Sequence, residues 1–251
     1  MYGKEAVIII KEEYQLKQFY SGLEALGITC SEKQIHQFLT FYEMLTEKNK
    51  VMNLTAITEF QDVIEKHFLD SLSLAENRNL NQKLKVIDLG TGAGFPGIPL
   101  KIAFPELELV LMDSLNKRIL FLKEVIEELG LSGITAVHGR AEEMAVQPDY
   151  REKFDLCVSR AVANLASLSE YCIPFVKVGG NFVSYKSAEV EEEVQQAKKA
   201  IHVLGGKVVN VQKFTLPGTE VSRSLVQIEK QKKTPKGYPR KSGTPSKSPI
   251  H

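Results

Sequence analysis

This sequence of 251 residues has few of the residues that characterise disulfide-rich and metal-binding proteins. It has no tryptophan and only three cysteines, Cys30, Cys157 and Cys172, which are far apart and odd in number. Such cysteine usage is typical of a reducing cytosol and argues against a disulfide framework. No cluster of cysteine and histidine has metal-ligand spacing, so we expect no metal site.

Long apolar runs are also missing. None approaches the ~20 residues that cross a membrane. The apolar stretch at residues 6–10 is too short for a signal peptide and has acidic flanks. We therefore expect a cytoplasmic protein without a membrane partner. Its length fits one large domain, or a core domain with an appendage.

The net charge of +1 conceals an uneven distribution. Residues 230–251 contain seven cations, four prolines and no carboxylate, which leaves −6 for the rest of the chain. A basic tail on a mildly acidic body is typical of a protein whose tail meets a polyanion. We expect residues 231–251 to lack regular structure, so that their removal would leave the fold and any ligand site intact. A tail that only aids solubility is the alternative.

The first part of the chain, residues 1–83, reads as a helical region packed on a core. Its clearest helix has one apolar stripe at three- and four-residue steps. The stripe consists of Ile35, Phe38, Leu39, Tyr42 and Leu45. Ser31 with Gln34, and Thr58 with Gln61, each have the spacing of a capping box. They predict the starts of two helices.

Residues 84–230 alternate between short apolar strands and helices. Strands are predicted at 86–89, 107–112, 134–137, 154–158, 181–185, 207–214 and 223–229. The early strands are apolar on both faces, which indicates a parallel, doubly wound sheet. The last two are joined by a short connection and must pair antiparallel. We expect an α/β fold of the Rossmann-like class I methyltransferase type, with a mostly parallel seven-stranded sheet and an antiparallel closing hairpin.

The most specific motif runs from Asp88 to Gly97, directly after the first strand. Glycines at 90, 92 and 94 permit a tight turn and let a ligand approach the backbone. The helix that follows would favour an anionic or carboxylate-bearing ligand. A dinucleotide loop has the spacing G-x-G-x-x-G, whereas reading from Gly90 gives G-x-G-x-G. The motif therefore resembles an S-adenosylmethionine loop, and a dinucleotide site or a sharp turn without ligand are the alternatives.

Two further strand ends carry candidate ligand groups. Asp113 ends the second strand, where an acidic residue accepts hydrogen bonds from a ribose diol. Glu142, with Ala141, follows the third strand and could accept from an adenine amino group. Each has a structural alternative, since an acidic residue near a helix start also stabilises the helix.

Arg160 ends the fourth strand and should face the crevice at the carboxyl ends of the central strands. A surface ion pair is the alternative for this arginine. His67 and Asp70 share a helix face just before the sheet, and either are structural or border the crevice. No nucleophile elbow accompanies them, which disfavours a hydrolase.

Together these motifs resemble the RsmG (GidB) family of bacterial 16S rRNA guanine-N7 methyltransferases, over nearly the whole chain. The matching pieces are Asn53-Leu54-Thr55, His67 with Asp70-Ser71, the loop 88–99, Asp113-Ser114 with Lys117-Arg118, Arg140-Ala141-Glu142, Ser159-Arg160-Ala161 and residues 238–245. The run Gly94-Phe95-Pro96-Gly97-Ile98-Pro99 is the most specific of them.

The resemblance implies S-adenosyl-L-methionine as cofactor and 16S rRNA, free or in the small ribosomal subunit, as partner. It implies cofactor contacts at Gly90, Phe95, Ala141, Glu142 and Arg160, to which loop geometry adds Gly92 and Asp113. Arg160 is also a candidate for positioning the target. The candidate RNA contacts in the tail are Lys232, Lys233, Lys236, Arg240 and Lys241. We expect a monomer, and the rival classes are an NAD-dependent oxidoreductase and a non-catalytic rRNA-binding assembly factor.

Overall fold

A seven-stranded sheet forms the centre of the protein. The computed structural model describes residues 14–160 and 163–250. The strands are β1 (Lys85–Leu89), β2 (Glu108–Asp113), β3 (Ile134–His138), β4 (Phe154–Arg160), β5 (Val176–Ser187), β6 (Gly206–Thr215) and β7 (Ser222–Lys230). Their order is β3-β2-β1-β4-β5-β7-β6, with β7 antiparallel to both β5 and β6 and all other pairs parallel. The predicted strands and the antiparallel closing hairpin are confirmed.

The strand order determines at which edge of the sheet a ligand crevice can form. From β1 the chain moves outward through β2 and β3, then returns to lay β4 on the other side of β1. Connections therefore diverge between β1 and β4, and a crevice opens at the carboxyl ends of these strands. Leu89 is level with Met112 in β2, and Asp88 is level with Val158 in β4.

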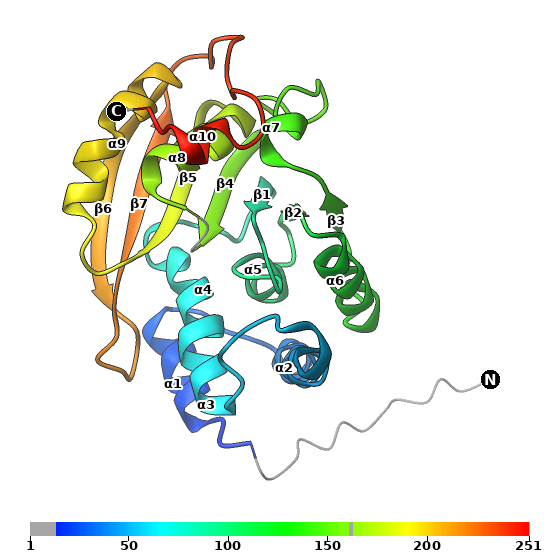
Figure 1. Cartoon of the computed structure of the whole chain (residues 1–251). Helices are drawn as coiled ribbons and strands as arrows, with labels where there is room; N and C mark the ends of the chain where they lie inside the picture. The colour runs from blue at the N-terminus through cyan, green and yellow to red at the C-terminus, as the bar shows by residue number, and fades with distance from the viewer. Residues whose placement is uncertain (1–13, 161–162, 251) are drawn as a thin grey trace.

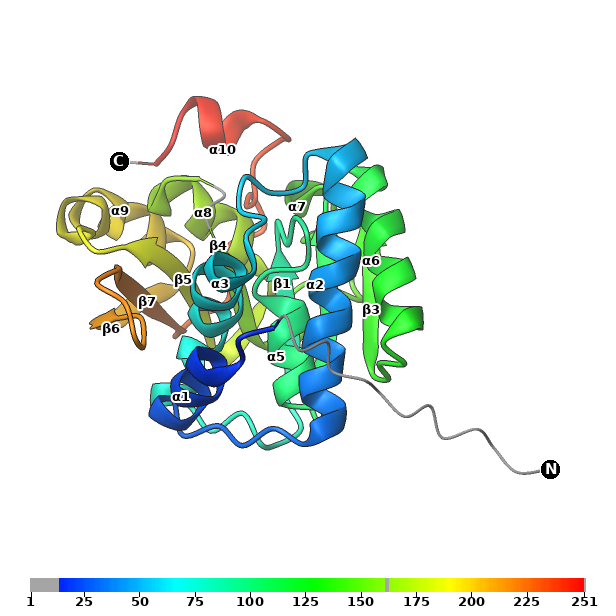
Figure 2. The same ribbon diagram turned by 90° about the horizontal axis from the view of Figure 1, so that it is seen from below.

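Helices cover both faces of the sheet (Figures 1 and 2). One face carries α5 (Gly97–Ala103) and α6 (Asn116–Glu128), whose apolar residues share a core with β1 and β2. The other carries α7 (Ala141–Met144), α8 (Leu165–Cys172), the short 3₁₀ turn Ile173–Phe175 and α9 (Glu191–Val203). Successive strand residues point to opposite faces, so Val86 joins the first core and Ile87 the second.

The N-terminal helices pack onto the first face. They are α1 (Lys17–Ala25), α2 (Glu32–Met52), α3 (Phe60–Val63), the π-helical turn Ile64–Leu69, α4 (Asp70–Leu72) and the 3₁₀ turn Ser73–Asn77. The predicted capping box of Ser31 and Gln34 is present at the start of α2. The second predicted box is wrong, because α3 begins after Glu59 without a side-chain cap.

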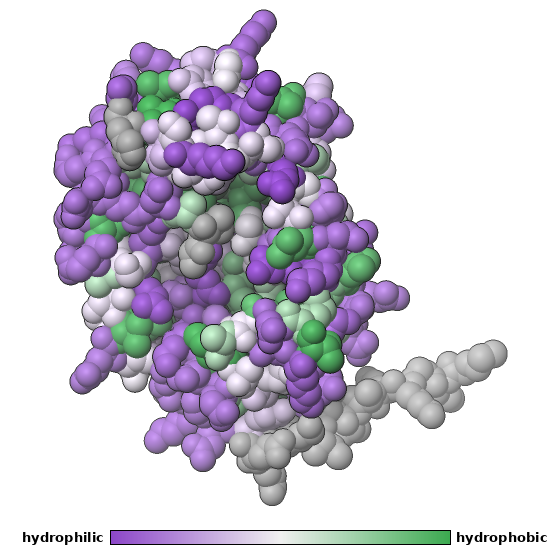
Figure 3. Space-filling model, in the orientation of Figure 1, coloured by the Kyte–Doolittle hydropathy of each residue, from purple (hydrophilic) through white to green (hydrophobic). Residues whose placement is uncertain are grey.

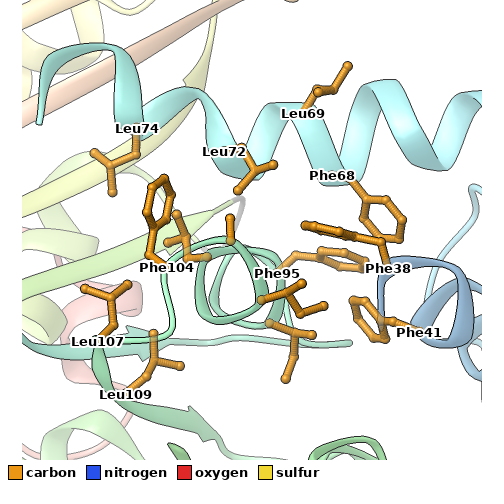
Figure 4. Packing of buried hydrophobic residues seen from close by; sticks show 14 of the residues in the cluster. Phe38, Phe41, Phe68, Leu69, Leu72, Leu74, Phe95, Phe104, Leu107 and Leu109 are labelled. Atoms are coloured by element: carbon orange, nitrogen blue, oxygen red, sulfur yellow. The ribbon is translucent and has the colours of Figure 1, made fainter. Parts of the chain in front are cut away.

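An aromatic cluster joins these helices to the sheet (Figure 4). Phe38 and Phe41 of α2 contact Phe68, and Phe41 lies 5.3 Å from Phe95 of the glycine-rich loop, measured between ring centroids. Phe38, Phe41 and Phe68 are almost fully buried. The N-terminal region therefore shares one continuous core with the sheet and supports the loop from beneath.

The expectation of a tail without regular structure is wrong for Thr244–Lys247, which form a short helix, and is confirmed for the other described tail residues. Residues 231–250, here called the C-terminal segment, cross the molecule near α7 and α8 and include the short helix α10 (Thr244–Lys247) (Figure 1). Thr234, Pro239 and Pro245 are buried. The Arg151 guanidinium donates hydrogen bonds to the carbonyls of Thr234 and Tyr238, both at 2.9 Å. These polar contacts thus hold the segment in a defined position, although it has too few apolar residues to form a core of its own.

Residues 14–160 and 163–250 contain neither a membrane-spanning helix nor a cluster of metal-binding side chains. No helix there has the length and apolar character needed to cross a membrane. Nor do three or more histidine, cysteine, aspartate or glutamate side chains come together there in a way that could hold a metal ion.

Candidate cofactor and active site

Three cavities follow one another along the carboxyl edge of the sheet. The first, of about 230 Å³, lies over the ends of β2 and β3, and the second, of about 370 Å³, lies over the glycine-rich loop. They share Gly90, Asp113 and Ser114, so they are neighbouring parts of one crevice. A third, of about 550 Å³, shares His67 and Arg160 with the second. Figure 3 shows the hollow in this face of the molecule.

The glycine-rich loop is shaped from beneath by Asp88. Its Oδ2 accepts hydrogen bonds from the Thr91 hydroxyl at 2.7 Å and from the Gly97 amide at 2.8 Å. Burial raises the pKa of the Asp88 carboxyl to about 7, although both hydrogen bonds and the charge of Arg160 lower it. Asp88 is completely buried, so it organises the loop instead of contacting a ligand directly.

Glycines of the loop serve two different purposes. A Cβ on Gly97 would lie 2.3 Å from Leu111 and 2.8 Å from the Asp88 carboxylate, so Gly97 is required for close packing. Gly92 has φ +62°, and a Cβ there would meet only open space, with the Gly90 carbonyl 4.0 Å away. Because Gly92 borders the second cavity, that open space is where a ligand can approach the backbone.

Asp113 connects the loop to the first cavity. Its Oδ2 accepts from the Gly92 amide at 3.0 Å and the Arg118 guanidinium at 3.1 Å, and its Oδ1 accepts from the Leu115 amide at 2.9 Å. Asp113 therefore supports the start of α6, as the structural alternative has it, and it also borders both cavities. Its contact with a ribose stays a prediction. A carboxylate accepts about four hydrogen bonds, which leaves one position on Oδ1 for a ligand hydroxyl.

Arg160 lies at the boundary between the second and third cavities. Its guanidinium donates to the Asp70 carboxylate at 3.0 Å and to the Lys66 carbonyl at 3.2 Å. It also lies 5.0 Å from the centre of the Phe95 ring, a cation–π contact. The π-helical turn and β4 thus hold this arginine from two sides, and the ion pair with Asp70 is inside the crevice rather than on the surface.

His67 completes this group. Its ring stacks on Phe95 at 4.4 Å between centroids, and the Arg160 Nη2 lies 3.2 Å from its Nδ1. Nδ1 also lies 3.1 Å from the Lys66 carbonyl, and Nε2 lies 2.9 Å from the Thr55 hydroxyl. Burial, followed by the charge of Arg160, lowers the pKa of His67 to about 3. The ring is therefore neutral at neutral pH, and these neighbours hold it in place.

All seven predicted cofactor residues border the first two cavities. Gly90, Asp113, Ala141 and Glu142 line the first, and Gly92, Phe95 and Arg160 join Gly90 and Asp113 in the second. Sequence reasoning missed Tyr171, Gly243 and Ser246 in the first cavity. Only their fold position brings them there, since no motif near them indicates a ligand.

The candidate RNA contacts of the C-terminal segment divide into two groups. Lys232, Lys233, Lys236 and Lys241 are exposed to solvent. Arg240 instead forms an ion pair with Glu170 of α8. Glu170 is only 1% exposed, so Arg240 neutralises a carboxylate inside the protein. This arginine is not a free cation available for RNA.

The strand order and the crevice at the ends of β1, β2 and β4 are those of the Rossmann-like class I methyltransferase fold. Among solved structures, the chain is similar to a mutant of MtNAS with a TM-score of 0.52 and 16% identity, over 85% of this chain and 82% of the other. At that identity the likeness shows the fold alone.

The chain belongs to the GidB family, rRNA small subunit methyltransferase G, whose model matches residues 34–226. It is 55% identical to the ribosomal RNA small subunit methyltransferase G of Lachnoclostridium phytofermentans, over 92% of this chain and 96% of that protein. It is 50% identical to the protein of the same name from Acetivibrio thermocellus, over 96% of this chain and 98% of that protein.

Proposed function

We propose that this protein transfers a methyl group from S-adenosylmethionine to N7 of a specific guanine in the 530-loop region of 16S rRNA. The observation that carries the proposal is the crevice that joins the glycine-rich loop, Asp113 and Arg160, in a chain of this family. The enzyme would act in the cytoplasm as a monomer, on rRNA or on the small ribosomal subunit.

The crevice fits the cofactor in shape and chemistry. Ligand pockets have volumes of ~300–1,000 Å³, which the two joined cavities reach together. The open side of Gly92 admits the ligand to the backbone, and the remaining lone pair of Asp113 can accept from a ribose hydroxyl. Ala141 and Glu142 border the opposite end, where the adenine would lie. Bound adenosylmethionine supplies an electrophilic methyl group on a sulfonium.

Methylation of guanine N7 needs no general base. N7 carries a lone pair and no proton, so no group has to remove one. His67 lies 3.2 Å from Arg160, and its pKa of about 3 makes it a poor proton acceptor at neutral pH. The protein would contribute positioning instead, which is worth up to ~7–11 kcal/mol for well-oriented reactants.

We place the target guanine in the third cavity. It opens beside Arg160 on the side away from Asp113, and the ends of β4 and β5 border it. Its lining has four cationic side chains, Lys66, Arg160, Lys186 and Arg223, against two carboxylates, Asp70 and Glu193. This excess of positive charge suits the phosphates that flank a base drawn out of its stack.

The test is a transfer assay with the purified protein, methyl-labelled adenosylmethionine and either naked 16S rRNA or small subunits from a strain that lacks this enzyme. We expect one methyl group per rRNA, mapped by mass spectrometry to N7 of a guanine in the 530-loop region. Methylation at another atom would overturn the assigned target. Binding of the rRNA without transfer would favour the assembly-factor alternative.

A further inference from the structure

The C-terminal segment is attached to the body of the protein at several places along its length. Near its start, Thr234 is buried, donates its hydroxyl to the Leu204 carbonyl at 2.8 Å, and donates its amide to the Glu152 carboxylate at 2.8 Å. Further along, Arg151 holds two carbonyls of the segment. Toward its end, the Ser167 hydroxyl donates to the Pro245 carbonyl at 2.7 Å. The segment therefore has a defined path over α7 and α8 (Figure 1).

The strongest fastening is the pair of Arg240 and Glu170. Arg240 donates from Nε to Oε1 at 2.9 Å and from Nη2 to Oε2 at 2.6 Å, and its backbone amide also donates to Oε1 at 2.7 Å. Within residues 14–160 and 163–250, Arg240 supplies every hydrogen bond and ion pair of the Glu170 carboxylate. A buried carboxylate whose partner comes from the C-terminal segment strongly favours the docked arrangement.

Beyond this anchor the segment reaches the first cavity. The Gly243 amide donates to the Glu142 carboxylate at 2.9 Å, and the Ser242 hydroxyl donates to Glu143 at 3.1 Å. Gly243 and Ser246 then line the cavity together with Ala141, Glu142 and Asp113. The outer wall of this cavity is therefore built in part by a segment that lies more than 90 residues further along the chain.

We infer that the C-terminal segment is a wall of the adenosine end of the cofactor pocket, held there by the Arg240–Glu170 pair. Arg240 and Glu170 are positioning residues for cofactor binding, and they act through Gly243, Ser246 and the orientation of Glu142. This inference rests on the proposed function, because it takes the first cavity as the place of the adenosine. It reverses the expectation that removing the tail would leave the ligand site intact.

Thermodynamic linkage then makes the effect reciprocal. If docking of the segment raises the affinity for the nucleoside by some factor, bound nucleoside must raise the docking equilibrium constant of the segment by the same factor. Adenosylmethionine should therefore protect the segment from trypsin, which cleaves after exposed lysines such as Lys236 and Lys241. Lys83 is an exposed lysine in the loop before β1 and is not in the cavity lining, so it serves as the internal control.

The first experiment uses the unmodified protein. Trypsin cleavage at Lys236 and Lys241 is followed by mass spectrometry with and without saturating S-adenosylhomocysteine. We expect cleavage there to slow about tenfold, while cleavage at Lys83 is unchanged. Equal rates at Lys236 and Lys241, under conditions where calorimetry shows the ligand bound, would overturn the inference. A full-length protein that binds neither adenosylmethionine nor adenosylhomocysteine would overturn the proposed function itself.

The second experiment compares Arg240→Gln with Lys241→Gln. Both remove one positive charge from adjacent positions, but only Arg240 pairs with Glu170. We expect the KM for adenosylmethionine to rise about tenfold in Arg240→Gln, with kcat at saturating cofactor within twofold, whereas this KM should stay unchanged in Lys241→Gln. Equal effects of the two substitutions on rRNA affinity, with the KM for cofactor unchanged, would show that the segment acts on RNA and overturn the inference.

A deletion of residues 242–251 tests the same inference in a protein that keeps the Arg240–Glu170 pair, so that misfolding after loss of this pair does not affect the result. It removes Gly243 and Ser246 from the cavity but keeps Arg240 with Glu170 and Thr234 with Glu152. We expect an unfolding midpoint close to that of the full chain without ligand, and about tenfold weaker adenosylmethionine binding by calorimetry. Unchanged affinity in this deletion would overturn the inference.

Discussion

The two ends of the chain attach to the same α/β core in different ways. The N-terminal helices bury Phe38, Phe41 and Phe68 in a core that continues into the sheet. The C-terminal segment attaches mainly through Arg151, Arg240 and hydrogen bonds to backbone carbonyls. Apolar burial supplies most of the free energy of folding, whereas polar docking contributes less and depends on geometry. We therefore expect the N-terminal helices to stay packed on the core, whereas the docking of the C-terminal segment should respond to bound ligand.

The largest expected effect is on the N-terminal side. Phe68→Ala would remove a fully buried ring that contacts Phe38 and Phe41, and should lower the free energy of unfolding by ~3–5 kcal/mol. Urea denaturation measures this change. Tyr20→Ala is the control, because Tyr20 is 48% exposed, and it should cost less than ~1 kcal/mol. Similar losses in both variants would mean that the N-terminal helices do not share the core.

The next effect concerns the loop that lies between the two ends. In Gly92→Val a branched side chain would fill the space open to the ligand, and φ of +62° would cost ~1–2 kcal/mol in strain. We expect adenosylmethionine affinity to fall more than ~100-fold, about 2.7 kcal/mol, while circular dichroism shows a folded protein. Retained affinity would contradict the assignment of the loop as the binding surface.

On the C-terminal side, Arg151→Met would keep an apolar stem and remove the donors to Thr234 and Tyr238. The free energy of unfolding should fall by ~1–3 kcal/mol, which is the size of hydrogen bonds from a charged group. Arg140→Met is the matched control, because Arg140 is exposed and its side chain makes no hydrogen bond or ion pair within residues 14–160 and 163–250. A loss in Arg151→Met as large as that in Phe68→Ala would erase the difference between the two ends.

Asp113→Ala probes the carboxylate that borders both cavities. Its loss would free the Gly92 amide and remove the remaining acceptor position on Oδ1, so we expect adenosylmethionine binding to weaken by ~1–3 kcal/mol. Arg118→Ala is the comparison, since it removes a partner of Asp113 and a side chain of the second cavity but keeps the Asp113 carboxylate. A loss of affinity below twofold would leave Asp113 only its role at the start of α6.

The last effect is a change in pH dependence at Asp88. Its folded pKa of about 7 lies above its ordinary value of 3.8, so the stabilisation it gives is complete below pH 3.8 and is lost as pH rises through 7. Asp88→Asn removes this ionisation. Between pH 5 and 8, the free energy of unfolding should fall less in the variant than in the unchanged protein, by ~1.4 kcal/mol for each pKa unit involved. Parallel pH profiles would contradict the raised pKa.

The sequence by itself determined the order of elements and most of the site. Strand patterns at seven places, and the glycines after β1, are local signals that do not depend on distant residues, so they could be read directly. The ends of parallel strands meet at one edge of a sheet, which is why Gly90, Asp113, Glu142 and Arg160 could be placed together in advance.

Only the tertiary structure decided the roles of Glu170, Gly243 and Ser246, and the true place of Arg240. Charge and proline content indicated a loose basic tail, because composition measures how little a segment can bury by itself. It cannot show that a carboxylate 70 residues earlier lies buried in α8 at the spot where the chain returns. Such long-range ion pairs form where the fold brings complementary charges together. Their positions follow from the tertiary structure and not from the local sequence, which is why the docking of the segment could not be predicted.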